Sequence, residues 1–184
     1  MRRLLLVLAA VALSACGSDR APAVADTSCF GTRVLSYRDL VAEVLIPAGE
    51  SCESGSFVIV FTRGDDSLRT LVETRVGTVG FIGTADVDGD GRGEFFVATH
   101  GADAERRGTL FAYAEGTSGI ERFPLASLAD EQLEGYAGQD RFGFGGANQL
   151  VRAYPVGTAG DTAWFGYSHG EARWDRITRP SWVR

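Results

Sequence analysis

The sequence predicts an all-β fold, an antiparallel β-sandwich with one short connecting helix behind an N-terminal export signal. Three observations support this prediction. Short apolar segments rich in β-branched residues recur along the chain, several alternate apolar and polar residues, and Gly- and Asp-rich turns separate them. The 24 glycines among 184 residues fit such a density of turns. A series of short strands with tight turns is typical of a sandwich or a barrel.

The expected strands follow one another with turns between them. The first is a long β-branched and leucine-rich stretch that ends at a Pro-Ala-Gly turn, and the next is a continuous apolar run of the buried type. In order, the expected strands are Arg33 to Ile46, Ser56 to Thr62, Leu68 to Val76, Val79 to Thr84, Glu94 to Thr99, Thr109 to Ala114, Arg141 to Phe144, Gln149 to Tyr154, Thr162 to Tyr167 and Ala172 to Ile177.

One segment is expected to be helical. Ser127 begins a sequence that has the order of a capping box, Leu128 and Leu133 offer an apolar side, and Gly135 can end the helix. We expect about two turns of helix that connect strands.

The N-terminus has the layout of a lipoprotein signal peptide. Arg2 and Arg3 give a positive end, and Leu4 to Leu13 form an apolar run that is too short to span a membrane. Small residues then precede Cys16, which predicts residues 1–15 as the signal peptide and Cys16 as the lipidated first residue of the mature chain. Residues 16–28 then form a flexible tether. An ordinary signal peptide with a chance cysteine is the alternative.

Composition bounds the mature chain to one domain, residues 29–184. The signal peptide holds two of the 18 basic residues and none of the 24 acidic ones, which leaves 16 against 24, a net charge of −8. An acidic chain without a basic run is a poor partner for nucleic acid, and it predicts contact with the membrane through the lipid anchor only. Gly17, rather than an aspartate, follows Cys16, which favours the outer membrane, facing the periplasm or the cell surface.

Two cysteines remain after lipidation. Cys29 and Cys52 form an even pair, and in an oxidising compartment the default is one disulfide. Closing this loop should stabilise the fold by about 3 kcal/mol. Free or metal-binding thiols are the alternative, although His100 and His169 have no partner at ligand spacing.

An acidic loop predicts a calcium site. Oxygen donors occupy alternate positions at its start, a glycine at position 6 allows a sharp turn, and a main-chain carbonyl stands at position 7, as a hard cation requires. An EF-hand is excluded because Val97 stands where a bidentate Glu belongs and the flanks are strand-like. The loop resembles the calcium-binding hairpins of integrin-type FG-GAP repeats. A solvated polar turn and a single propeller blade are the alternatives. The expected ligands are Asp86, Asp88, Asp90, Arg92 (through its carbonyl) and Glu94.

From Gly77 to Tyr154, with a closing strand beyond, the order of segments resembles the periplasmic inhibitors of invertebrate-type (i-type) lysozyme. The matching segments are Ala85 to Glu94, Gly108 to Leu110, Gly135 to Phe142, Leu150 to Val156 and Gly170 to Trp174. The resemblance implies a β-sandwich that plugs a lysozyme active site with an exposed loop.

This chain departs from the family in that loop. The family carries Ser-Gly-x-Tyr before a glycine, whereas the aligned positions here are Ala104, Glu105, Arg106 and Arg107, before Gly108. Lysozyme clefts are built around paired carboxylates, so Arg106 and Arg107 are the candidate partner-binding residues, as charge-assisted donors. Solvation of both arginines at the loop tip is the alternative.

These observations favour a non-enzymatic, calcium-stabilised binding protein of the bacterial envelope, and the resemblance implies that its partner is an i-type lysozyme, which it would inhibit. The second hypothesis is an envelope protein that docks another envelope component without inhibiting lysozyme. A hydrolase is the weakest hypothesis, because the sequence has no Gly-x-Ser-x-Gly elbow and no zinc-ligand cluster.

The lipid anchor is tested by Cys16→Ser, which removes the thiol that accepts the lipid. We expect the variant to lose metabolic lipid labelling and to move into the soluble periplasmic fraction. A variant that still labels and stays with the membrane would contradict the anchor.

Overall fold

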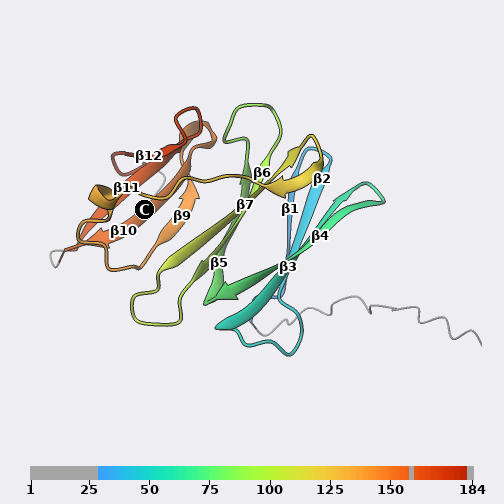
Figure 1. The fold of residues 1–184 in the computed structure, drawn as a ribbon, viewed down its shortest axis with the longest axis horizontal. Helices are drawn as coiled ribbons and strands as arrows, with labels where there is room; N and C mark the ends of the chain where they lie inside the picture. Colours follow the sequence, from blue (N-terminus) through green and yellow to red (C-terminus); the bar gives the residue numbers. More distant parts are fainter. Residues whose placement is uncertain (1–28, 158–159, 182–184) are drawn as a thin grey trace, which may run out of the picture.

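A computed structural model describes residues 29–157 and 160–181, so the signal peptide, Cys16 and the tether lie outside the described residues. The described chain forms three four-stranded antiparallel sheets (Figure 1). In order along each sheet, the strands are β1 (Thr32–Tyr37), β2 (Leu40–Leu45), β3 (Ser54–Arg63) and β4 (Asp66–Val76); β5 (Thr78–Ala85), β6 (Glu94–His100), β7 (Gly108–Gly116) and β8 (Gly119–Arg122); and β12 (Arg173–Arg176), β11 (Asp161–Ser168), β10 (Leu150–Val156) and β9 (Arg141–Phe144).

The predicted all-β sandwich is confirmed, and it has three layers. The β5–β8 sheet lies between the other two (Figure 1). Apolar side chains therefore project from both of its faces, each into a different core. In β6, Phe95 and Val97 belong to the core shared with the β1–β4 sheet, and Phe96 belongs to the core shared with the β9–β12 sheet. A strand buried on both faces reads as a continuous apolar run, which is why this segment showed little alternation.

Most expected strands differ from the observed ones by one or two residues at their ends, and two differences are larger. The stretch from Arg33 to Ile46 is a hairpin, with Tyr37 paired to Leu40 across a two-residue turn. Arg38 takes a positive φ of 54° in this turn. Arginine is uncommon in this conformation, so the sequence carried no signal for a turn here. The short strand β8 was also missed, because its four residues lie between a turn and a proline-containing segment.

The predicted helix is a single 3₁₀ turn, η1 (Asp130–Leu133), and a second, η2 (Gly146–Asn148), was not predicted. Ser127 is not its cap. The N-cap is Ala129, whose N–H donates to Oε1 of Gln132 at 2.9 Å. The capping interaction therefore begins two residues after Ser127, the expected cap. Gly135 follows the turn with φ of 73°. None of the described helices is long and apolar enough to cross a membrane.

The disulfide between Cys29 and Cys52 is confirmed, with 5.1 Å between the Cα atoms. The loop that contains Cys52 is held by Arg75, which is 2% exposed on β4. Its guanidinium donates to the carbonyls of Cys52 at 2.8 Å, Gly77 at 2.7 Å and Ser56 at 2.9 Å. A buried arginine whose donors meet main-chain carbonyls fixes a loop that has no regular structure of its own.

Candidate metal centre and binding loop

The acidic loop connects β5 to β6 and is closed by its own carboxylates. Asp86 accepts the N–H of Gly91 at 3.0 Å, and Asp88 accepts the N–H of Asp90 at 3.0 Å. Gly91 has a positive φ of 84°, which lets the chain turn back toward the strand. Glu94, the first residue of β6, is 1% exposed and accepts the N–H of Val87 at 2.6 Å.

Three of the predicted ligands meet in space. Carboxylate oxygens of Asp86, Asp88 and Glu94 all lie within 4.8 Å of one another. Oδ1 of Asp86 is buried and, among the described residues, has no hydrogen-bond partner. A buried carboxylate oxygen without a donor is unfavourable unless a cation or a water supplies the missing contact. The cluster can therefore hold a metal ion.

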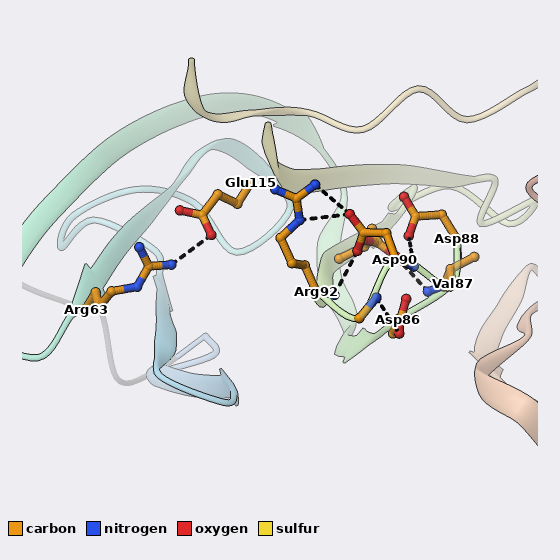
Figure 2. A network of polar contacts seen from close by, with 9 residues as sticks. Arg63, Asp86, Val87, Asp88, Asp90, Arg92 and Glu115 are labelled. Atoms are coloured by element: carbon orange, nitrogen blue, oxygen red, sulfur yellow. Dashed lines mark hydrogen bonds and ion pairs between the residues drawn. The ribbon is translucent and has the colours of Figure 1, made fainter. Parts of the chain in front are cut away.

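Asp90 and Arg92 turn toward each other instead of toward the cluster (Figure 2). Asp90 accepts the Arg92 N–H at 2.7 Å and Nε at 2.8 Å, and the two side chains form an ion pair. These bonds lower the pKa of Asp90. The structure thus brings three of the four predicted carboxylates together and pairs the fourth with the arginine whose carbonyl was the predicted ligand.

Burial shifts the pKa of Glu94. Desolvation raises its pKa to about 7, the hydrogen bond from Val87 opposes this shift, and the charges of Asp88 and Asp86 add to it. A cation among these carboxylates would favour the ionised form of Glu94.

Two residues that the sequence analysis did not single out brace this loop. The ring of Tyr37 lies against Gly93 so closely that a Cβ at position 93 would be 2.3 Å from its Cγ. The guanidinium of Arg38 lies beside Gly91, where a Cβ would be 3.4 Å from it. The β1–β2 turn therefore supports the acidic loop, a long-range contact with no local sequence signal.

At the other end of β6, residues 101–107 form the loop in which the family motif was expected (Figure 1). Residues 102–107 are all exposed. The two candidate arginines have different surroundings. Arg107 forms an ion pair with Glu105 and lies over the ring of Tyr136, 5.7 Å from its centroid. Arg106 lines a cleft beside the loop instead.

The exposed loop is fixed by the segment that precedes β9. The N–H of Gln139 donates to the Glu105 carbonyl at 2.6 Å, and its side-chain amide donates to the Ala104 carbonyl at 2.8 Å. Gly138 makes this approach possible, because a Cβ there would be 1.8 Å from the Glu105 oxygen, and its φ is 86°. The loop is therefore held in one position while its side chains face solvent.

Asp140 anchors the same junction. Its carboxylate accepts the N–H of Gly108 at 2.6 Å, the hydroxyl of Tyr136, and Nε of Arg152 at 2.7 Å, and its side chain is fully buried. Burial, followed by the bond to Asp140, raises the pKa of Tyr136 to about 12, which keeps this hydroxyl a donor. The residues that carry the family resemblance on both sides of the loop thus form one polar network.

A cleft of about 370 Å³ lies between this network and β5. Its lining includes Phe81, His100, Arg106, Arg141 and Phe142. Burial lowers the pKa of His100, so its imidazole is neutral at pH 7, and its Nδ1 has no hydrogen-bond partner within the described chain. The sequence analysis found only that His100 has no partner at ligand spacing, and it gave no signal that Arg141 and Arg106 would line the same cleft.

No family model matches the chain, and no curated protein matches it. Two solved structures are similar to it. One is the periplasmic inhibitor of I-type lysozyme from Aeromonas hydrophila, with 21% identity and a TM-score of 0.48 over 54% of this chain and 91% of the other. The second is the A. hydrophila inhibitor in complex with a lysozyme from Meretrix lusoria, with 22% identity and a TM-score of 0.43 over 50% and 80% of the two chains.

The Asp140 network predicts how the loop is kept in place. Asp140→Asn keeps the side-chain shape but leaves the Arg152 charge without its partner, so we expect a loss of about 3 kcal/mol in unfolding free energy. Hydrogen exchange at the Gly108 amide should become faster, because this N–H loses its ionised acceptor. The matched control is Asp130→Asn, an exposed acid in η1 that should change neither quantity. Unchanged protection of Gly108 would show that Asp140 does not hold the loop.

Proposed function

We propose that the protein is a calcium-stabilised, lipid-anchored binding module of the bacterial envelope whose 101–107 loop docks into the cleft of an i-type lysozyme. The observation that carries the proposal is the combination of exposure and fixation in this loop. Residues 102–107 face solvent, while Gln139 and Asp140 hold the backbone on either side through hydrogen bonds. A loop that is already ordered loses little conformational entropy on binding, which favours a tight complex.

The partner class comes from sequence and from charge. The ordered motifs between Ala85 and Trp174 resemble the lysozyme inhibitors, and the loop stands where that family carries its inhibitory motif. At the two hydroxyl-bearing positions of that motif this chain has Ala104 and Arg107, and Arg106 stands at the variable position between them. A guanidinium forms charge-assisted, two-point hydrogen bonds with a carboxylate, and glycosidase clefts contain a carboxylate pair.

Calcium is proposed from the donor set. Asp86, Asp88 and Glu94 offer only carboxylate oxygens, which hard cations prefer. Ca²⁺ accepts six to eight oxygens in flexible geometry, so main-chain carbonyls such as that of Arg92, together with Asp90 and water, can complete its shell. Mg²⁺ demands a smaller octahedral shell and releases its water reluctantly. The cation would offset the repulsion among carboxylates that the packed strands hold in place.

Anchoring at the outer membrane follows from Cys16 and Gly17, and it would place the module where an incoming lysozyme arrives, facing either the periplasm or the cell surface. A second function, docking of another envelope component without lysozyme inhibition, is favoured by one observation. Arg107 already pairs with Glu105, so a lysozyme carboxylate would have to replace that partner.

The lysozyme hypothesis is tested with the purified mature domain and an i-type lysozyme. We expect dose-dependent inhibition, and the double variant Arg106→Ala with Arg107→Ala should raise the inhibition constant about tenfold or more, because two charge-assisted contacts are lost. Arg173→Ala is the matched control, since Arg173 and Arg107 have equally exposed side chains and each pairs with a nearby acid. Full lysozyme activity at a large molar excess of the domain would exclude this partner and leave the docking function.

Calcium binding is tested by thermal unfolding in Ca²⁺, in Mg²⁺ and in chelator. At 100 times the dissociation constant, a ligand that binds only the folded state adds about 2.7 kcal/mol, which should raise the melting temperature by roughly 5–10 °C. We expect Mg²⁺ to give a much smaller rise. Asp88→Ala should remove most of the Ca²⁺ effect, Asp90→Ala should remove less because Asp90 pairs with Arg92, and Asp130→Ala should leave it intact. Identical melting curves in Ca²⁺ and in chelator would mean that the loop is only a turn.

A further inference from the structure

The cleft beside the 101–107 loop is a basic site on an acidic chain. Arg106 reaches it from the loop and Arg141 from the start of β9. Neither guanidinium takes part in an ion pair with a described Asp or Glu, whereas the one acid in the lining, Asp140, is neutralised by Arg152. The cleft therefore presents two uncompensated positive charges, although the whole sequence has a formal net charge of −6.

Three aromatic rings form one part of the cleft wall. Phe81 and Phe142 lie with their centroids 6.4 Å apart, and the ring of His100 lies 6.0 Å from that of Phe142. His100 adds no charge, because burial lowers the pKa of its imidazole. Gly80 completes the lining and leaves room for the imidazole, since a Cβ there would be 2.2 Å from its Nδ1.

The volume and the chemistry together define a ligand class. About 370 Å³ is at the lower end of the range for small-molecule sites, roughly 300–1,000 Å³. Two guanidinium groups at the rim favour an anion that accepts hydrogen bonds in a plane, and a carboxylate has this geometry. The rings behind them favour an apolar group next to that anion. A multiply charged anion fits less well, because the buried carboxylate of Asp140 lies in the same lining.

We propose that this cleft binds a small organic carboxylate, with the anionic group between Arg106 and Arg141 and the apolar part against Phe81 and Phe142. The cleft shares Arg106 with the 101–107 loop, but the inference does not rest on lysozyme inhibition, because it is tested by direct binding of small acids in the absence of any lysozyme. Two sources carry this chemistry: a sugar acid, and the acidic side chain of a docked protein.

The test follows amide chemical shifts of the mature domain during titration with two matched pairs of probes. N-acetylmuramic acid and N-acetylglucosamine share a sugar ring and differ in the O-lactyl group that carries the carboxylate. N-acetylglutamic acid α-amide and N-acetylglutamine α-amide differ only in the side-chain carboxylate, which is an amide in the second compound. We expect saturable shifts at Gly80, His100 and Phe142 with at least one acid, and none with its uncharged counterpart. Saturation by the sugar acid alone assigns that source, and saturation by the glutamate compound alone assigns a protein side chain.

Three variants locate the charge. Arg106→Gln and Arg141→Gln should each weaken binding of the active acid about tenfold, since each removes a charge-assisted contact. Arg141→Lys, which keeps the charge but not the planar fork, should give an intermediate loss. Arg173→Gln, on β12, should bind like the native chain, and native-like spectra of every variant establish that it is folded. The proposal is overturned if neither acid saturates, if the uncharged probes bind equally well, or if both Gln variants bind with unchanged affinity.

Discussion

Strand β6 is buried on both faces, and this constraint fixes the positions of the acidic loop and of the 101–107 loop. All seven of its residues are buried, with Phe95 and Val97 in one core and Phe96 in the other. A shift of one residue would exchange the two cores, so its register is strongly specified. The acidic loop enters this strand at Glu94 and the 101–107 loop leaves it at His100, so the two candidate sites are held at opposite ends of one fixed element (Figure 1).

The two ends use burial in different ways. At the acidic loop, desolvation and, to a smaller extent, the charges of Asp88 and Asp86 raise the pKa of Glu94, and a cation would favour its ionised form. At the other end, Asp140 is buried with its partners supplied: Arg152, Tyr136 and the Gly108 N–H satisfy it. A carboxylate cluster with an unpartnered oxygen, Oδ1 of Asp86, suits a bound ion, whereas a fully hydrogen-bonded carboxylate suits a structural anchor. This difference separates the candidate metal centre from the support of the binding loop.

Packing gives the two neighbouring arginines of the 101–107 loop different surroundings. Arg106 and Arg107 are neighbours in sequence, yet Arg107 pairs with Glu105 and lies over Tyr136, while Arg106 faces a cleft with Arg141. The loop can therefore present one compensated and one uncompensated guanidinium to a partner. In an acidic chain, such a local positive site determines where an anion approaches.

Short-range patterns by themselves determined the all-β class, most of the strands and the position of the acidic loop, and the number of cysteines indicated the pairing of Cys29 with Cys52. Alternation, turn residues and donor spacing are encoded over a few neighbouring residues, so they can be read without a structure. Only the tertiary structure decided which side chains meet. It buried Glu94 and brought Arg106 and Arg141 to one cleft, because residues far apart along the chain are brought together by sheet packing and not by their separation in sequence.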